Sequence, residues 1–358
     1  MIELAHGNLL NASAQALVNT VNTEGVMGKG IALQFKNAYP QVFKEYAAAC
    51  KAGHVILGKM DVHDLGSIGG GPRWVINFPT KGHWRSNSRL EDVASGLKDL
   101  VTTVQRLGIE SIAIPPLGCG NGGLNWVDVR PMIQKAFEEL PSVQVLMFEP
   151  AGAPASATMP NRTARPKLSA ASASLVLLMH RYLRGLMDPF ISLLEVHKLM
   201  YFMQEAGQPL KLKYQPDTYG PYAPNLAHLI KRLNGHFLTG YGDGSSDPTT
   251  PLEPIPEGVE EAYAFLARDD ETNKRFDRVM NLIDGYEDSY GMELLSTMHW
   301  VMVHHEDARK DANSAIKHVH GWSARKQRLL KAAHLEKAWQ RLKEQEWDFN
   351  SSSIAVTH

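Results

Sequence analysis

The chain has 358 residues, of which 44% are hydrophobic and 21% charged, and it carries a formal net charge of −1. These values are typical of a soluble globular protein long enough for two domains, and they argue against a general electrostatic attraction to nucleic acid. Two cysteines, Cys50 and Cys119, are too few for a disulfide scaffold. The N-terminus lacks a signal-peptide pattern and no apolar run reaches about 18 residues, so we expect a cytoplasmic protein without a membrane span.

Short apolar runs alternate with helical patterns over residues 1–150. The runs predict strands at residues 2–5, 16–21, 75–78, 111–115 and 143–148, and the patterns predict helices at 30–35 continuing into 39–49, at 89–107 and at 127–140. In the 89–107 segment, apolar residues recur at the spacing of an amphipathic helix. Strands that alternate with helices predict a layered α/β domain.

Two glycine-rich loops, residues 19–32 and 114–124, each follow a predicted strand. Glycine lets backbone N–H groups approach a ligand closely, and a helix N-terminus after such a loop favours an anion. The pair therefore predicts a grip on a diphosphate, with Gly120 at positive φ beside it. Neither loop has the spacing of a P-loop or the chain position of a Rossmann fingerprint, and each alone is also compatible with a tight turn.

Residues 151–170 are small residues and prolines without an apolar period, which predicts a flexible linker. Residues 171–350 are predicted to form a mainly α-helical domain. Its helices are expected at residues 174–185, 191–206, 226–233, 259–268, 269–282, 294–303 and 323–345. Residues 214–224 hold three prolines and three tyrosines, which exclude a helix and predict a fixed loop or short β-turn as a candidate binding edge.

Charges and histidines in the second half leave alternatives open. Asp269, Asp270 and Glu271 belong to an acidic stretch, and the basic residues follow after Arg309. Either these are two solvated helical faces, or the acidic surface imitates DNA toward a partner. The histidine spacings fit no common zinc pattern, so we predict ordinary surface histidines and no metal: His299, His304, His305, His318 and His320.

Four ordered motifs in the first half resemble a macro domain: residues 7–10 (Gly-Asn-Leu-Leu), 18–22 (Val-Asn-Thr-Val-Asn), 28–32 (Gly-Lys-Gly-Ile-Ala) and 116–120 (Pro-Leu-Gly-Cys-Gly). The resemblance implies a three-layer α/β/α domain with a mixed sheet that binds ADP-ribose. The ADP-ribose contacts are then expected at Asn8, Leu9, Thr20, Gly28, Lys29, Gly30, Ile31, Ala32, Pro116, Gly118, Cys119, Gly120, Asn121 and Gly122. The segment 76–81 (Ile-Asn-Phe-Pro-Thr-Lys) resembles the branch that removes ADP-ribose with a lysine.

The second half resembles Panacea-type antitoxin domains at residues 198–201, Gln204 and 219–224. The two halves together resemble the DarG family of antitoxins. This implies N-glycosidic removal of ADP-ribose from thymidine in DNA without a cofactor, and direct binding of the cognate DNA ADP-ribosyltransferase toxin, DarT. Toxin contacts are expected at Tyr219 or at Asp269, Asp270 and Glu271. The rival interpretations are a non-catalytic ADP-ribose reader and a hydrolase of protein-linked ADP-ribose.

Lys81 and Asn22 are the expected catalytic residues. A neutral Lys81 either attacks C1 of the distal ribose or acts as a base on the ribose hydroxyls, which requires a lowered pKa. Asn22 either orients the distal ribose or closes an Asx turn. The resemblance places Asn8 at the adenine amino group, and it places Gly122 where some lysine-using relatives carry an acid.

Trp84 and Arg85 follow Lys81 and are candidate DNA contacts. An aromatic ring flanked by cations can stack on a base that has left the duplex and hold its phosphates. The alternative is that Trp84 packs on the domain edge. For Cys119, a small residue in a tight phosphate loop explains the position better than a nucleophile does, because no histidine is adjacent in the sequence.

Overall fold

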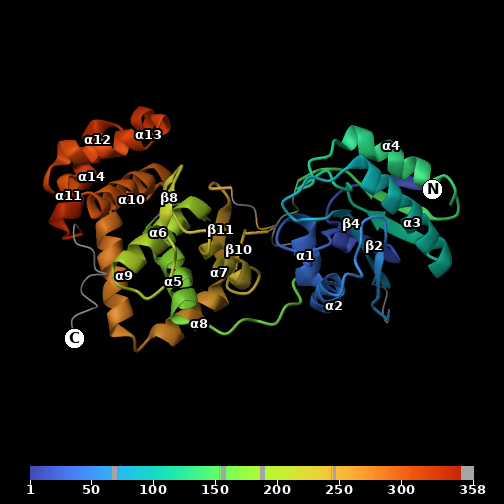
Figure 1. The fold of residues 1–358 in the computed structure, drawn as a ribbon. Coiled ribbons are helices and arrows are strands. Elements are labelled where there is room, and N and C mark those ends of the chain that lie inside the picture. Colours follow the sequence, from blue (N-terminus) through green and yellow to red (C-terminus); the bar gives the residue numbers. More distant parts are fainter. Residues whose placement is uncertain are drawn as a thin grey trace. The chain divides into compact units, whose positions relative to one another are not determined.

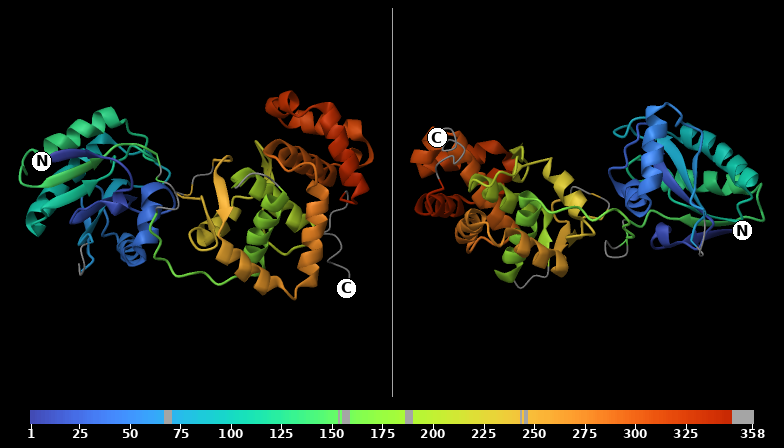
Figure 2. Two further views of the ribbon diagram at one scale, coloured as in Figure 1. Left: turned by 180° about the vertical axis from the view of Figure 1, so that it is seen from behind. Right: turned by 90° about the horizontal axis from the view of Figure 1, so that it is seen from below.

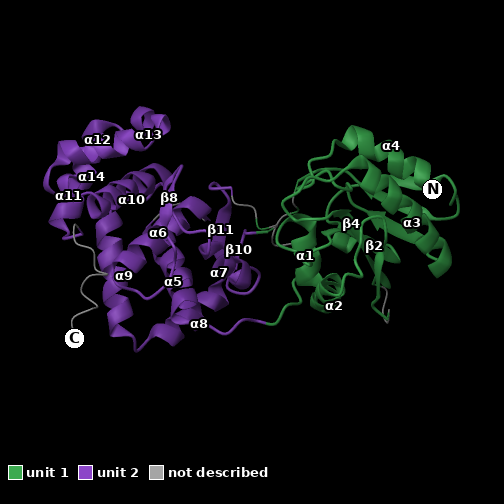
Figure 3. Cartoon of the chain, in the orientation of Figure 1, with its two compact units in different colours: residues 1–164, 242–245 green, residues 165–241, 246–358 purple. Residues whose placement is uncertain are grey.

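The structure is a computed structural model that describes residues 1–66, 71–152, 154, 159–185, 190–242, 244 and 247–347. The chain divides into two compact units, shown in Figure 3: unit 1 contains residues 1–164 and 242–245, and unit 2 contains residues 165–241 and 246–358. Part of the predicted linker (153 and 155–158) and the end of the predicted helical domain (348–350) lie outside the described residues.

Unit 1 is built on a six-stranded sheet in the order β1-β6-β5-β2-β4-β3. Edge strand β3 pairs antiparallel with β4, and the other pairs are parallel. The strands are β1 (Ile2–Ala5), β2 (Ala16–Asn22), β3 (Asp61–Asp64), β4 (Trp74–Lys81), β5 (Ser111–Ile114) and β6 (Gln144–Phe148). The helices are α1 (Gly30–Ala38), α2 (Pro40–Lys51), α3 (Leu90–Leu107) and α4 (Trp126–Phe137).

The two faces of this sheet are covered by different helices (Figures 1 and 2). Ala16 and Val18 of β2 belong to the buried cluster that includes the apolar faces of α3 and α4. Leu17, between them, belongs to the cluster that includes residues of α1 and α2. Alternate residues of one strand point to opposite faces, so each face buries its own helix pair. The predicted three-layer α/β/α domain with a mixed sheet is therefore confirmed.

The site lies where three neighbouring parallel strands end. Strand β2 lies between β5 and β4 in the sheet, and the glycine loops follow β2 and β5 directly. Carboxyl ends of parallel strands meet at one edge of a sheet, which is the usual place for a ligand in such folds. This topology brings the two glycine loops and Lys81, the last residue of β4, to the same edge.

Unit 2 is mainly helical, as expected, and contains one large buried apolar cluster. Its helices are α5 (Ala170–Gly185), α6 (Leu193–Glu205), α7 (Leu226–Leu233), α8 (Pro256–Leu266), α9 (Asp270–Ile283), α10 (Ser289–His304), α11 (Glu306–Lys310), α12 (Ala312–Trp322), α13 (Ala324–Leu329) and α14 (Ala332–Glu344). Its short strands are β7 (Ile191–Ser192), β8 (Gln215–Asp217), β9 (Gly220–Tyr222), β10 (Leu238–Thr239) and β11 (Pro251–Pro254). Among the described residues, no helix combines the length and the apolar character needed to cross a membrane.

Two local predictions for unit 2 can be compared with the structure. The predicted single helix at 323–345 is wrong, because Leu330 and Lys331 adopt extended backbone and separate α13 from α14. Leu330 is buried in the core of unit 2, which fixes the break. Residues 214–224 contain a β-hairpin, β8–β9, whose turn includes Tyr219. Gly220 ends the turn at φ +93°, and a Cβ there would lie 2.7 Å from Thr297 Oγ1, so only glycine fits.

Candidate active site

Lys81 joins the three loops at the edge of the sheet. Its Nζ donates a hydrogen bond to the backbone oxygen of Asn121 in the second glycine loop, at 2.8 Å. The backbone N and the Oγ1 of Thr23, at the start of the first loop, donate to the carbonyl of Gly82 at 3.0 and 3.1 Å. At Gly30, a Cβ would lie 3.0 Å from Asn121 Nδ2. The structure therefore assembles Lys81, Gly30 and Asn121 at one point.

The environment of Lys81 shifts its amine toward the neutral form. The side chain is partly buried, and this burial lowers the pKa of the Lys81 ammonium from its ordinary value of 10.5. Loss of hydration destabilises the charged amine more than the neutral one. A larger share of neutral amine at physiological pH is the property that a nucleophile or a base at this position requires.

Asn22 shapes the first glycine loop with its side chain. Its Oδ1 accepts from the backbone N–H groups of Glu24 at 2.9 Å and Val26 at 3.3 Å, and its Nδ2 donates to the Val26 carbonyl at 2.6 Å. The Tyr46 hydroxyl donates to the Asn22 carbonyl at 2.6 Å. The Asx turn weighed for this position is thus formed, and strand register places Asn22 opposite Lys81. A role in orienting the ribose stays a prediction.

The first glycine loop ends at the N-terminus of α1. Gly30, the first residue of the helix, has φ +62°, and the preceding Lys29 provides no side-chain cap. The first turn of α1, which contains Ile31 and Ala32, therefore presents N–H groups that no side-chain cap satisfies, together with the positive end of the helix dipole. This is the arrangement that binds a phosphate. Gly28 precedes the helix, and a Cβ there would make only an ordinary contact with the Val26 side chain, at 3.7 Å.

The second glycine loop contains glycines of two kinds. Gly118, at φ +72°, and Gly122 leave no room for a Cβ, because it would meet Leu124 and Ser88 in the first case and Ser88 and the Gly118 carbonyl in the second. Gly120 is exposed, is not at positive φ, and has nothing within 4 Å of an added Cβ. The expectation of positive φ at Gly120 was therefore wrong, since the glycines of this loop with positive φ are Gly118 and Gly123. The protein's own packing does not require glycine at 120.

The expected adenine side of the site is formed by the segment after β1. Asn8 caps the short 3-10 helix Leu9–Asn11, and its side-chain oxygen accepts from Leu10 N at 3.0 Å. A carbonyl oxygen has two lone pairs, so a second hydrogen bond is compatible with this cap. Leu9 is buried in the cluster against which Ile31 packs, which links this segment to the first turn of α1. Thr20 is half-buried on β2.

Cys119 is held as a thiol. Burial and, to a smaller extent, the nearby Asp128 carboxylate raise the pKa of the Cys119 thiol to about 11. Its Sγ donates to the Leu117 carbonyl at 3.5 Å, and its backbone N donates to the carbonyl of Pro116 at 3.1 Å. A thiolate is the reactive form of cysteine. The side chain therefore serves the shape of the loop rather than nucleophilic chemistry.

Trp84 and Arg85 form an exposed platform two residues beyond Gly82. The Trp84 side chain is 43% exposed, the His83 ring stacks on it with centroids 5.5 Å apart, and the Arg85 guanidinium lies 4.5 Å from its ring centroid. His83 Nε2 lies 3.5 Å from a carboxylate oxygen of Glu24 in the first glycine loop. An exposed aromatic ring with a cation over it suits stacking on a nucleobase.

A buried polar network behind the first loop was missed at the sequence level. Asn19 Nδ2 donates to Asn77 Oδ1 at 2.9 Å, and Asn77 Nδ2 donates to Asp61 Oδ2 at 2.9 Å. His63 contacts Asp61 at 2.8 Å through Nε2 and Glu45 at 3.0 Å through Nδ1. Burial lowers the pKa of His63, but the hydrogen bonds and charges of the two carboxylates outweigh it and leave the pKa raised. The only available signal was the alternation of Asp61 and His63, in an edge strand that was not predicted.

In unit 2, the two sets of expected toxin contacts have different surroundings. Tyr219 is 37% exposed, and the Arg325 guanidinium lies 4.4 Å from its ring centroid. Arg325 in turn holds the Glu293 carboxylate with both terminal nitrogens.

The acidic residues at the start of α9 take part in local helix stabilisation. Asp269 is the N-cap and accepts from the backbone of Thr272 at 2.9 Å, and Glu271 pairs with Lys274 at 2.8 Å. Asp270 lies in the first turn, where a carboxylate is stabilised by the helix dipole. Capping, the helix dipole and an ion pair thus give each of these three acids a role within the helix. A contact with the toxin at these residues stays a prediction.

Comparisons with known proteins give the family. The model of the Macro domain family matches residues 18–133. A DNA ADP-ribosyl glycohydrolase of Thermus aquaticus is 44% identical over 338 residues, which cover 94% of this chain and 92% of that protein. A DNA ADP-ribosyl transferase–DNA ADP-ribosyl glycohydrolase fusion protein of Thermosipho africanus is 34% identical over 153 residues, 39% of each chain. The macrodomain of Mycobacterium tuberculosis DarG has 52% identity, covers 42% of this chain and 99% of its own, and has a TM-score of 0.42. Since the 44% identity to the Thermus aquaticus protein extends over 94% of the chain, the protein belongs to the DarG family of DNA ADP-ribosyl glycohydrolases.

Proposed function

We propose that this chain hydrolyses the N-glycosidic bond between ADP-ribose and thymine in DNA, with Lys81 as the reacting residue. The observation that carries the proposal is the 2.8 Å hydrogen bond from Lys81 Nζ to Asn121, which holds an amine of lowered pKa beside both glycine loops. Family membership and the name of the Thermus aquaticus relative support a DNA-linked substrate. The lowered pKa of Lys81 supports catalysis over passive reading, because a reader has no need of an amine shifted toward its neutral form.

The diphosphate of ADP-ribose would be held by backbone N–H groups from both loops. The uncapped first turn of α1 provides one set, and the open space beside Gly120 gives room for the phosphates next to the other. The adenine would extend toward Asn8 and Leu9. With the anion held in this way, the chemistry requires no metal cofactor.

Lys81 has two possible routes to the same products. In the first, the neutral amine attacks C1 of the distal ribose, the bond from C1 to thymine breaks, and thymine leaves with the electron pair and takes a proton from water. A water molecule then displaces the lysine and releases ADP-ribose. In the second, Lys81 takes a proton from a ribose hydroxyl while water attacks C1 and the bond from C1 to thymine breaks. The ribose oxygen regains a proton from the attacking water, and the Lys81 ammonium gives its proton to the departing thymine. Gly122 offers no carboxylate to resolve an adduct, which favours the second route.

Borohydride separates these routes. In the first route, the glycosylamine formed at C1 opens its ribose ring to an imine, which borohydride would reduce to a stable adduct whose mass appears on a peptide containing Lys81. The absence of an adduct under turnover conditions, together with full hydrolysis, would assign Lys81 the role of a base.

The substrate is tested by parallel reactions with two labelled substrates. The full chain is incubated with single-stranded DNA carrying ADP-ribosylated thymidine and, separately, with an ADP-ribosylated protein, and free ADP-ribose is measured. We expect release from the DNA and none from the protein, with Trp84→Ala slowing the DNA reaction. Release only from the protein would make the chain a hydrolase of protein-linked ADP-ribose instead. Binding without release from either substrate would make the chain a reader.

We also propose that unit 2 binds and neutralises the DNA ADP-ribosyltransferase toxin. The fusion of a transferase to a glycohydrolase in the Thermosipho africanus protein supports such a pairing. The hairpin tip is the preferred contact, because Tyr219 is exposed and its ring lies under the Arg325 guanidinium, which is held by a partly buried ion pair with Glu293. An aromatic residue beside an arginine is typical of an interface hot spot.

A pull-down with a catalytically inactive toxin compares the two candidate surfaces on the full chain. Tyr219→Ala is expected to weaken the complex at least tenfold. Reversal of Asp269, Asp270 and Glu271 to lysine is the matched test of the acidic surface, and a stronger effect there, lost at high salt, would move the contact to α9. No complex at micromolar concentration would remove the neutralising role from unit 2.

A further inference from the structure

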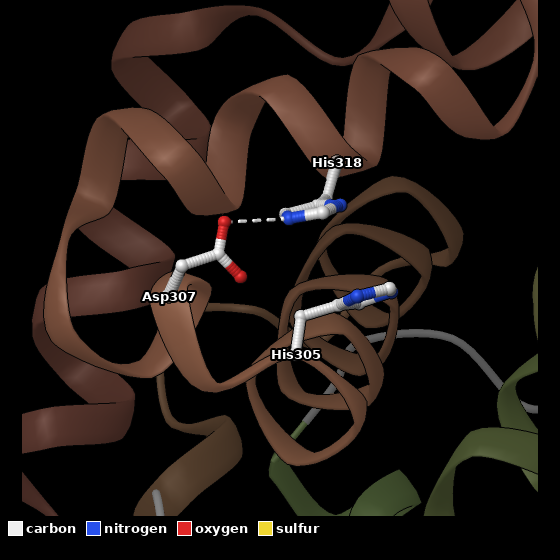
Figure 4. Close-up of side chains that lie close together, drawn as sticks. All are labelled: His305, Asp307 and His318. Atoms are coloured by element: carbon white, nitrogen blue, oxygen red, sulfur yellow. Dashed lines mark hydrogen bonds and ion pairs between the residues drawn. The ribbon is translucent and has the colours of Figure 1, made fainter.

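Two histidines and an aspartate from successive elements of unit 2 meet at its surface (Figure 4). His305 links α10 to α11, Asp307 lies in the first turn of α11, and His318 lies on α12. Each offers one ligand atom, and these three atoms all lie within 4.8 Å of one another. Figure 4 shows the two rings one above the other, with the Asp307 carboxylate facing the edge of the His318 ring. Sequence spacing hid this cluster, because His318 joins it only through the packing of α12.

The two imidazoles are arranged in a way that disfavours two protons. Their rings stack with centroids 4.0 Å apart and planes 16° from parallel. Two charged rings at that distance would repel each other. Neutral imidazole is the form that binds a metal ion.

Asp307 completes a set of ligands of defined chemistry. One of its oxygens lies 2.8 Å from His318 Nε2, so the carboxylate already faces the nitrogen that would bind a metal. Two imidazole nitrogens and a carboxylate oxygen suit zinc-like transition metals, whereas magnesium and calcium prefer oxygen ligands alone. The three residues also line a cavity of about 730 Å³, together with Trp300, Trp322 and Ser314. This cavity leaves room for water in the remaining coordination positions of the ion.

We propose that His305, Asp307 and His318 bind one zinc-class divalent ion, which fastens α12 to the junction of α10 and α11. With bonds of about 2.0–2.2 Å, the ligand atoms of a tetrahedral site lie roughly 3.4 Å apart. The Asp307 oxygen and His318 Nε2, now 2.8 Å apart, would move slightly apart, and the His305 nitrogen would approach them. His305 and Asp307 are exposed and can make this adjustment by side-chain rotation. The ion takes the place of the proton between His318 Nε2 and Asp307, and in the neutral ring that proton moves to Nδ1, so His318 stays a neutral imidazole ligand.

Isothermal titration of the chelator-treated full chain with ZnCl2 tests the site, with CoCl2 as a spectroscopic probe and MgCl2 and CaCl2 as hard-ion comparisons. We expect one tight zinc ion per chain, and a loss of at least tenfold in affinity for each of His305→Gln, His318→Gln and Asp307→Asn. His228→Gln is the matched control, since His228 is an exposed histidine on α7 outside the cluster. Its affinity should equal that of the wild-type chain.

Thermal unfolding gives a second readout that does not depend on enzyme activity. Zinc should raise the unfolding temperature of the wild-type chain and of His228→Gln, but not that of the His305→Gln/His318→Gln double variant. Circular dichroism of the metal-free proteins establishes that the variants fold alike. The proposal is overturned by an absence of zinc binding at micromolar concentration, by equal binding in the double variant, or by magnesium binding as tight as zinc binding.

Discussion

Replacement of Gly120 by valine should separate ligand binding from folding. The position has open space around an added Cβ and a backbone conformation that other residues adopt. The folded state should therefore accept valine with a change in the free energy of unfolding within about 0.5 kcal/mol, as for an ordinary surface substitution.

The expected loss appears in the affinity for ADP-ribose. The valine methyl groups would occupy space proposed for the diphosphate and push it away from the backbone N–H groups of the second loop. Hydrogen bonds to a charged group contribute roughly 1.5–3 kcal/mol each. Loss of one or two of them corresponds to a decrease in affinity of about 100-fold, or about 2.7 kcal/mol.

The assay pairs isothermal titration with ADP-ribose and urea denaturation on the same protein samples. Gly122→Ala is the control for packing, because its Cβ would clash with Ser88 and with the Gly118 carbonyl. That variant should lose about 1–3 kcal/mol of stability as well as affinity. Unchanged affinity in Gly120→Val would refute the placement of the diphosphate at this loop, and a large loss of stability would refute the packing argument.

Three further predictions concern charged groups. Glu293→Gln removes the carboxylate partner of the fully buried Lys326, and the free energy of unfolding of unit 2 should fall by about 3–5 kcal/mol in urea denaturation; the exposed ion pair of Glu271 serves as the control, and Glu271→Gln should leave the transition unchanged. The pKa of His63 is raised in the folded state, so its stabilising contribution is complete below about pH 6.5 and is lost as pH rises through the folded-state pKa; His63→Gln should flatten this decrease in thermal unfolding measured against pH. The turnover rate should rise with pH as Lys81 loses its proton and should level off below pH 10.5, because the pKa of Lys81 is lowered. A rate that falls as the pH rises toward 10.5 would contradict the assignment of neutral Lys81 as the reacting form.

Much of unit 1 was predictable because local pattern and tertiary role agree there. The glycine loops follow buried apolar strands, and the apolar stripe of α3 has a helical period, so each element could be read from its own residues. Strand β3 escaped prediction because its residues, Asp-Val-His-Asp, are polar at an edge. Their polarity is used by the network with Asn77, which only the pairing of β3 with β4 brings together.

Unit 2 was less predictable in detail because its features arise from packing between elements. The break at Leu330 follows from burial of that side chain, which a helical period in the sequence does not reveal. The acids at the start of α9 looked like a surface of one charge, but capping and an ion pair account for them. The cluster of His305, Asp307 and His318 likewise depends on the position of α12 beside α11.

The central claim is that Lys81 reacts while the glycine loops bind, and one comparison tests it most directly. Lys81→Ala and Lys81→Arg are assayed for ADP-ribose release from ADP-ribosylated thymidine DNA and for ADP-ribose binding. Alanine has no amine, and arginine keeps a charge near Asn121 but stays protonated at all accessible pH values. Both variants should therefore be inactive. Both should bind ADP-ribose within about tenfold of the wild-type chain, or about 1.4 kcal/mol. Retained turnover in either variant would contradict the assignment of Lys81 as the reacting residue.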